Sequence, residues 1–159
     1  MNTFSATTDT EAVVAAEREA VWAALTDPEL LPKLTPLLRH IETDGDSWRW
    51  QMSRVSVLGI SFSPCFTEKM RFEAPHRIEY THAPPPGRTE RTGADGWYEL
   101  TEVTGGTRLR ISLTLHVDLP LAKAAGPAVT RVMHAVMMRT GDRFASNLLK
   151  HLGVPAAQR

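Results

Sequence analysis

Residues 124–152 constrain the fold most, because apolar residues recur there every three or four positions over a long stretch. This spacing predicts one long amphipathic helix that needs an equally long apolar surface to lie on. Pro127 suits its first turn, and Gly153 followed by Pro155 suits its end. Gly141 weakens the middle of the helix and predicts a close contact or a bend there. The apolar stripe consists of Val129, Val132, Met133, Val136, Met137, Thr140, Phe144, Leu148 and Leu152.

Upstream segments alternate between apolar and polar residues, which predicts strands with one covered face and one wet face. Residues 4–16 are rich in Thr and Val and predict a first strand. Residues 39–43 and 47–55 flank the turn signal Asp44–Asp46 and predict a hairpin. In residues 107–120 the apolar residues that point one way are Leu109, Ile111, Leu113, Leu115 and Val117.

Three further strands are expected between these segments. Residues 60–75 alternate as one strand, with Phe62, Phe66, Met70 and Phe72 on one face and Ser61, Ser63, Cys65, Thr67, Lys69 and Arg71 on the other. Residues 77–82 follow as a second strand. Residues 97–103 form a hairpin with residues 107–120 through Gly105–Gly106, and residues 83–96 are expected to be a long exposed loop.

Residues 18–36, "REAVWAALTDPELLPKLTP", predict two short helices. Val21, Trp22 and Leu25 make one apolar stripe, and Asp27–Pro28 breaks the first helix so that the chain bends. We expect Trp22 to be a packing anchor. The two helices would close one end of the space beneath the sheet.

Together these elements predict an α+β fold, in which a curved antiparallel sheet of six or seven strands wraps around the C-terminal helix. One long helix covers only part of such a sheet, so a pocket between sheet and helix is expected. At 159 residues the chain is expected to form one domain over residues 1–159, with an ordered core at about residues 4–153.

Composition excludes several classes of protein. Lys plus Arg and Asp plus Glu number 18 each, so no basic excess favours nucleic acid. The one cysteine, Cys65, excludes an intrachain disulfide. No apolar run reaches the roughly 18 residues of a membrane span. The polar N-terminus does not resemble a secretory signal, which predicts a cytoplasmic protein.

Four segments resemble one known superfamily: "AEREAVWAALTDPELLPKLTPLLRHIE", "TEKMRFEAPHRIEY", "TGGTRLRISLTLHV" and the terminal helix. They are similar to the START/Bet v 1-like (SRPBCC) superfamily, near two of its bacterial branches, the polyketide cyclase/dehydrase-like proteins and the proteins like the G-subunit of carbon monoxide dehydrogenase. The resemblance covers about Thr7 to Leu152. It implies a helix-grip fold around a ligand cavity but no single activity, since relatives include carriers, cyclases and receptors.

The expected cavity takes its lining from the apolar faces of the strands and of the helix. Its predicted residues are Trp48, Trp50, Phe66, Glu68, Met70, Tyr80, Tyr98, Leu113, Met133, Met137 and Phe144. Trp48 and Trp50 serve equally well as sheet packing, and Met133 and Met137 as core filler or as an adaptable wall.

Three residues are candidates for catalysis. Glu68 shares the apolar face of its strand, where a carboxyl must be paired, hydrogen-bonded or protonated. It can be a general base or a hydrogen-bonding group for a ligand, and the alternative is a bulge or a partner arginine. His82 has the phase of Ile78 and Tyr80 but lies at a strand end. Arg71 matches a cavity arginine of the cyclase relatives, although alternation puts it on the outer face unless a bulge intervenes.

We therefore expect a non-catalytic protein that binds a small hydrophobic molecule, lipid- or polyketide-like. A polyketide cyclase or dehydratase is the first alternative, although residues 36–40 lack the tyrosine that the cyclases carry. An assembly or membrane-recruitment factor, like the G-subunit of carbon monoxide dehydrogenase, is the second. The histidine and cysteine spacing predicts no metal site, no cofactor motif is present, and a homodimer is left open.

Overall fold

The computed structural model describes residues 1–155. Its helices are α1 (Arg18–Leu25), α2 (Leu31–Leu34) and α3 (Gly126–Leu152), the last preceded by a 3₁₀ turn at Lys123–Ala125. The strands are β1 (Asn2–Val14), β2 (Leu38–Asp44), β3 (Ser47–Met52), β4 (Val55–Val57), β5 (Ile60–Phe62), β6 (Cys65–Glu73), β7 (Arg77–His82), β8 (Thr92–Val103) and β9 (Gly106–Leu119).

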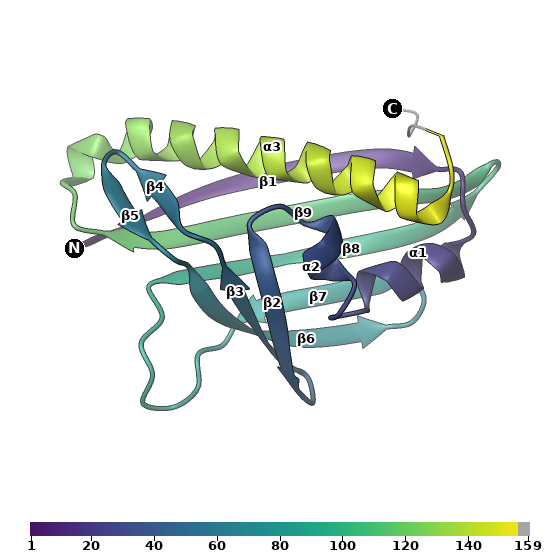
Figure 1. The fold of residues 1–159 in the computed structure, drawn as a ribbon, viewed down its shortest axis with the longest axis horizontal. Coiled ribbons are helices and arrows are strands. Elements are labelled where there is room, and N and C mark those ends of the chain that lie inside the picture. Colours follow the sequence, from purple (N-terminus) through teal and green to yellow (C-terminus); the bar gives the residue numbers. More distant parts are fainter. Residues whose placement is uncertain (156–159) are drawn as a thin grey trace.

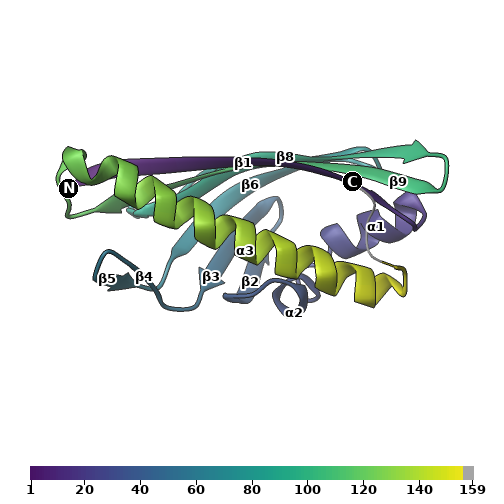
Figure 2. The ribbon, with the colours of Figure 1, turned by 90° about the horizontal axis from the view of Figure 1, so that it is seen from above.

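Seven of these strands form one antiparallel sheet in the order β1-β9-β8-β7-β6-β3-β2, while β4 and β5 make a separate hairpin. The sheet curls so that β2 and β3 cross in front of the other strands (Figure 1). Seen from above, α3 runs diagonally across the concave side, with α1 and α2 near its C-terminal end (Figure 2). This arrangement confirms the predicted α+β helix-grip fold.

Two strand boundaries differ from the prediction. Residues 60–75 do not form one strand, because Ser63–Pro64 separates β5 from β6, and proline cannot donate to a sheet ladder. The sequence patterns therefore do not predict the small β4–β5 hairpin, which turns at Leu58 and Gly59 with positive φ. The loop after β7 is also shorter than expected. β8 begins at Thr92, because the long strand β9 offers it partners as far as Val117.

The apolar residues gather in two clusters at opposite ends of α3. The first, which we call the α1 core, lies beneath α1 and α2 and includes Val21, Leu25, Leu34, Trp48, Ile78, Leu100, Leu109 and Leu148. The second, the hairpin core, joins α3 to β1, β9 and the β4–β5 hairpin and comprises Phe4, Ala6, Val57, Val117, Leu119, Val129, Met133 and Met137. The core is thus divided along the length of the helix.

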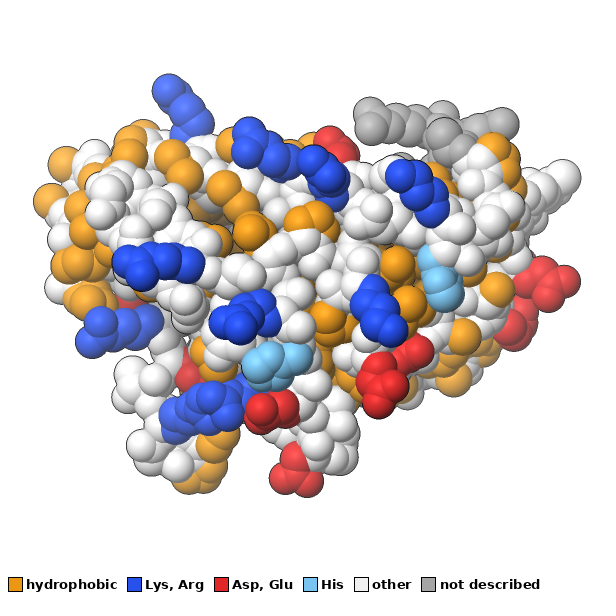
Figure 3. All heavy atoms as spheres, viewed as in Figure 1, with side chains coloured by type: hydrophobic (Ala, Val, Ile, Leu, Met, Phe, Trp, Pro, Cys, Tyr) orange, Lys and Arg blue, Asp and Glu red, His pale blue; other side chains and the backbone are white. Residues whose placement is uncertain are grey.

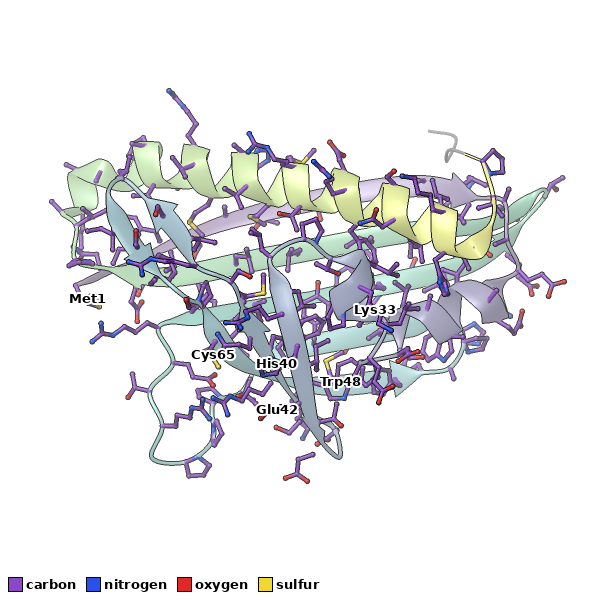
Figure 4. All side chains as sticks on the ribbon, in the orientation of Figure 1. Met1, Lys33, His40, Glu42, Trp48 and Cys65 are labelled. Atoms are coloured by element: carbon purple, nitrogen blue, oxygen red, sulfur yellow. The ribbon has the colours of Figure 1, made fainter. Side chains whose placement is uncertain are left out.

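Aromatic side chains extend from α1 along the crossing strands. Trp22 meets Phe72 edge-on at a ring distance of 6.3 Å, and Phe72 lies 5.7 Å from Trp48. Trp22 therefore packs as expected. Phe72 is 40 % exposed, because it stands near the end of β6 and is only partly covered by these rings. Figure 4 shows Trp48 between β2 and α1.

The ends of α3 match the prediction, but its middle does not. Pro127 lies in the first turn, and Gly153 ends the helix in the left-handed conformation at φ 69°. Of the close contact or bend expected at Gly141, the close contact is wrong, because a Cβ at this position would meet nothing within 4 Å. Gly96 is the opposite case. A Cβ there would collide with the Ser112 carbonyl oxygen and lie 2.6 Å from the Tyr80 hydroxyl oxygen.

Two alanine substitutions test this difference. Gly141→Ala should raise the free energy of unfolding by about 0.5–1 kcal/mol, because alanine is the better helix former and has open space here. Gly96→Ala should lower it by about 1–3 kcal/mol through steric overlap. Urea denaturation of both variants measures the effects. A destabilised Gly141→Ala or a neutral Gly96→Ala would contradict the described packing.

Candidate functional site

The middle of the sheet's concave face is incompletely covered. Along β9, Leu109 at one end is 6 % exposed and Val117 at the other is 4 % exposed. The three apolar residues between them on the same face, Ile111, Leu113 and Leu115, are all partly exposed. Leu113 and Leu115 pack against both cores and Ile111 packs against the α1 core, so these residues connect the two clusters while part of their apolar surface stays accessible.

Side chains around these three residues of β9 are also only partly covered. Trp50 on β3, Tyr98 on β8 and Phe144 on α3 pack against the α1 core and yet stay partly exposed. Burial nevertheless raises the pKa of the Tyr98 phenol well above its ordinary value. We use the name central hollow for this incompletely covered region of the concave face, formed by the partly exposed residues Ile111, Leu113, Leu115, Trp50, Tyr98 and Phe144.

Glu68 is the one acidic residue of β6 that is fully buried, at 3 % exposure. Its position in the register opposes Trp48 on β3, and its neighbours on the same face are Phe66 and Met70. No hydrogen bond or ion pair joins its carboxyl to any other described residue. Alternation along β6 predicted this inward position, and no bulge interrupts the pairing with β3 or β7.

The surroundings of Glu68 favour the neutral carboxyl. Desolvation raises its pKa well above the ordinary range, and the negative charge of Asp95 raises it further. The Trp50 indole N–H faces the carboxyl and partly offsets this rise in pKa. The contact falls short of a properly oriented hydrogen bond, since Trp50 Nε1 is buried without a partner. Glu68 is therefore a buried acid that can both donate and accept hydrogen bonds.

Two tyrosines stand beside this acid. The Tyr80 and Tyr98 rings are 5.7 Å apart, and the proximity of Glu68 contributes to the raised pKa of both phenols. The Tyr80 hydroxyl donates to the Ser112 carbonyl oxygen at 3.1 Å across Gly96. No hydrogen bond within residues 1–155 involves the Tyr98 hydroxyl. Tyr80 is thus held by the sheet, whereas Tyr98 is not.

His82 belongs to a different cluster. Its Nε2 lies 3.0 Å from Oε1 of Glu90, and its ring packs 4.8 Å from the His116 ring. Its backbone N–H donates to Asp95 at 2.9 Å. Glu90 also accepts from the hydroxyl and the backbone N–H of Thr67, each at 2.7 Å. Although it lies at a strand end, the His82 side chain is only 13 % exposed. His82 opposes Glu68 in the register between β6 and β7, but no hydrogen bond or ion pair within residues 1–155 joins the two side chains.

Arg71 lies outside the interior. Its side chain is 70 % exposed and pairs with Glu73 at 3.1 Å. The strand runs without a bulge, so simple alternation holds and the position of the cavity arginine is not reproduced. Among the predicted catalytic residues only Glu68 is therefore fully buried.

The predicted lining residues are divided by the two cores. Trp48, Phe66, Met70 and Tyr80 are buried in the α1 core, whereas Met133 and Met137 are buried in the hairpin core. Trp50, Glu68, Tyr98, Leu113 and Phe144 are the ones that the fold brings to the hollow between them. Sequence reasoning missed Glu90, whose side chain is 2 % exposed, because residues 83–96 were expected to be an open loop. The run "RTERTGADG" gives no signal of that burial.

Two shallow depressions on the surface of residues 1–155 are lined by residues outside α3. One, of about 760 Å³, lies by the β8–β9 turn and includes Val13, Glu102 and Arg108. The other, of about 420 Å³, lies over Trp22, Trp48 and Phe72. Figure 3 shows Lys and Arg side chains spread over α3 and the crossing strands, with hydrophobic atoms between them.

Neither a metal cluster nor a membrane-spanning helix occurs in the described part of the chain. Within residues 1–155 no three histidine, cysteine or acidic side chains group as metal ligands. No helix in the same residues is long and apolar enough to cross a membrane.

The raised pKa of Glu68 predicts a pH-dependent effect on stability. In the unfolded chain this carboxyl titrates near pH 4.3, so its contribution is fully present below that pH and is lost as the pH rises through the folded-state pKa. Glu68→Gln stays neutral. The free energy of unfolding of Glu68→Gln minus that of the unmodified protein should therefore be at least about 1 kcal/mol larger at pH 8 than at pH 4.

Urea denaturation at both pH values measures this difference. Glu68→Leu should show the same pH dependence with a different offset at pH 4, because it loses the polar group as well as the charge. An advantage of Glu68→Gln that shrinks as the pH rises would contradict a buried neutral acid.

Comparison with known proteins agrees with this architecture. The family described as "Polyketide cyclase / dehydrase and lipid transport" matches residues 5–149. No curated protein matches the sequence significantly. The protein TTHA0849 from Thermus thermophilus is similar in structure, with a TM-score of 0.67 and 17% identity, over 92% of this chain and 96% of that one.

Two further solved structures share the fold. A START superfamily protein from Mycobacterium smegmatis has a TM-score of 0.64 at 17% identity, over 92% of this chain and 97% of that one. The Zhui aromatase/cyclase from Streptomyces sp. R1128 has a TM-score of 0.62 at 14% identity, over 96% and 94%. The match over residues 5–149, on a helix-grip fold, shows that the chain belongs to the polyketide cyclase/dehydrase and lipid transport family.

Proposed function

We propose that the protein binds a small hydrophobic molecule, lipid- or polyketide-like, in the central hollow between the sheet and α3, and that it does so without catalysis. The observation that carries this proposal is the partly exposed apolar surface of Ile111, Leu113 and Leu115 on the face of β9 that also carries the buried Leu109 and Val117. Apolar area that a protein leaves uncovered is available to a ligand, at about 25 cal/mol per Å² of area removed from water.

The absence of catalysis is proposed from the separation of the candidate groups. General acid–base chemistry needs groups within hydrogen-bond reach of one reacting centre. Glu68 is buried, Arg71 is exposed, and His82, which opposes Glu68 in the register, has its Nε2 engaged by Glu90 instead. The cyclase alternative then depends on Glu68 alone. The assembly-factor alternative needs no internal space, so the uncovered surface supports it less well.

A substitution that fills the hollow tests the binding site. Leu113→Phe should weaken binding of the fluorescent apolar probe N-phenyl-1-naphthylamine by about tenfold or more, because the larger ring occupies the space. Its melting temperature should stay within about 3 °C of the unmodified protein. Thr114→Phe is the matched control, since the next residue on β9 faces away. Titration of probe fluorescence and thermal unfolding provide the two readouts.

Leu100→Phe tests whether a larger side chain is tolerated at Leu113 only and not in the closely packed α1 core. Leu100 is 2 % exposed, so a larger ring there should overpack the α1 core and lower stability by about 1–3 kcal/mol. If the unmodified protein does not bind the probe, or if Leu113→Phe binds it as well as Thr114→Phe does, the proposed site is wrong.

A further inference from the structure

Three polar groups in the apolar interior lack protein partners. They are the Glu68 carboxyl, the Trp50 indole N–H and the Tyr98 hydroxyl. Trp50 Nε1 is fully buried without a hydrogen bond, and no hydrogen bond within residues 1–155 involves the other two. An unsatisfied buried donor or acceptor is costly, and native proteins leave few of them. A fully buried donor beside a buried carboxyl and a partly exposed phenol, none of them hydrogen-bonded within residues 1–155, indicates a site whose partner comes from outside the chain.

The sheet register holds these groups close to one another. Glu68 opposes Trp48 and Trp50 opposes Phe66, so Trp50 and Glu68 are diagonal neighbours on β3 and β6. Tyr80 opposes Met70 on β6 and Gly96 on β8, and its ring lies 5.7 Å from that of Tyr98. Because Gly96 has no side chain, Tyr80 can lie flat over β8. The three groups therefore surround one region on adjacent strands.

We infer that Glu68, Trp50 and Tyr98 form a polar subsite that holds an uncharged carbonyl or hydroxyl group of the ligand, so that the hollow selects neutral aromatic molecules bearing such a group over carboxylates. This inference rests on the proposed function and specifies the ligand class. The indole N–H and a carboxylic O–H donate to a carbonyl oxygen, whereas the Glu68 carbonyl oxygen accepts from a hydroxyl.

Charge explains the discrimination against carboxylates such as fatty acids. The ionised group that bears most on Glu68 is Asp95, which has the same sign as a bound carboxylate. The nearest arginine on the same strand, Arg71, is exposed and paired with Glu73. An anionic ligand group would thus be desolvated beside an acid to which no ion pair within residues 1–155 brings a cation, which is unfavourable.

The walls of the subsite favour flat rings. Trp50 and Phe66 are stacked with an interplanar angle of 9° and a ring distance of 6.5 Å. Tyr98 stands beside Tyr80 on the sheet, and Phe144 on α3 is partly exposed near the same core. Aromatic faces of this kind bind aromatic ligands through offset or edge-to-face contacts.

Three ligands of matched shape test the inference: naphthalene, 2-naphthol and 2-naphthoate. Each would compete with N-phenyl-1-naphthylamine for the unmodified protein at pH 7. We expect 2-naphthol to bind about tenfold or more tightly than either of the others, since it alone is neutral and hydrogen-bonding. Equal affinity for the three ligands, or a preference for 2-naphthoate, would overturn the inference.

Variants of Glu68 separate hydrogen bonding from charge. Glu68→Leu should abolish the preference for 2-naphthol over naphthalene while still binding the probe. Glu68→Gln, which keeps a neutral donor and acceptor, should retain the preference within about threefold. Glu73→Leu, on the exposed part of the same strand, is the matched control and should bind like the unmodified protein. Loss of the preference in Glu68→Gln as complete as in Glu68→Leu would show that the subsite needs an ionised acid, and would also overturn the inference.

The two proposals fail in different ways. If no protein in the series binds the probe, the hollow is not a ligand site and the proposed function fails. If the probe binds normally but Glu68→Leu has the same ligand preference as Glu73→Leu, ligand binding stands and only the polar subsite is wrong.

Discussion

The packing of α3 against the sheet at two separate places determines the rest of this structure. Val129 near one end of the helix and Leu148 near the other are 0 % and 1 % exposed. They lie nineteen positions apart, or about 28 Å along a helix. Each belongs to a different core, so the helix is fixed at both ends and spans the concave face between them. Between these two contacts the apolar residues Ile111, Leu113 and Leu115 of β9 are only partly covered.

Two buried glutamates show how differently one residue type can be accommodated. Glu90 is satisfied by Thr67 and His82, and so ties the segment after β7 back to the edge of β6. Glu68, one position from Thr67 along β6, faces the opposite side of the sheet and has no such partners. The first glutamate stabilises the fold through the hydrogen bonds it accepts. The second is tolerated as a neutral acid and supplies the interior with hydrogen-bonding capacity.

Much of the fold could be predicted from the sequence, because alternation and helical periodicity are local signals. The inward position of Glu68, the outward position of Arg71 under simple alternation and the caps of α3 all follow from such patterns. The position of His82 could not be predicted, because its burial depends on Glu90, which a seven-residue loop segment carries back to the sheet. Nor could the division of the core, since whether Leu113 is covered depends on the distance between α3 and the sheet.

The location of α3 also matters for the rim of the sheet. β1 and β2 are its outermost strands, and an uncovered outer strand is a template on which another chain can pair. α3 lies alongside β1 and packs on Phe4 and Ala6, so that long strand is shielded by the helix (Figure 1). β2 has only seven residues and carries the ion pairs of Glu42 with His40 and Arg49. The helix that shapes the interior thus also protects the protein from aggregation along β1. At the opposite edge of the sheet, the short length and the charged residues of β2 have the same effect.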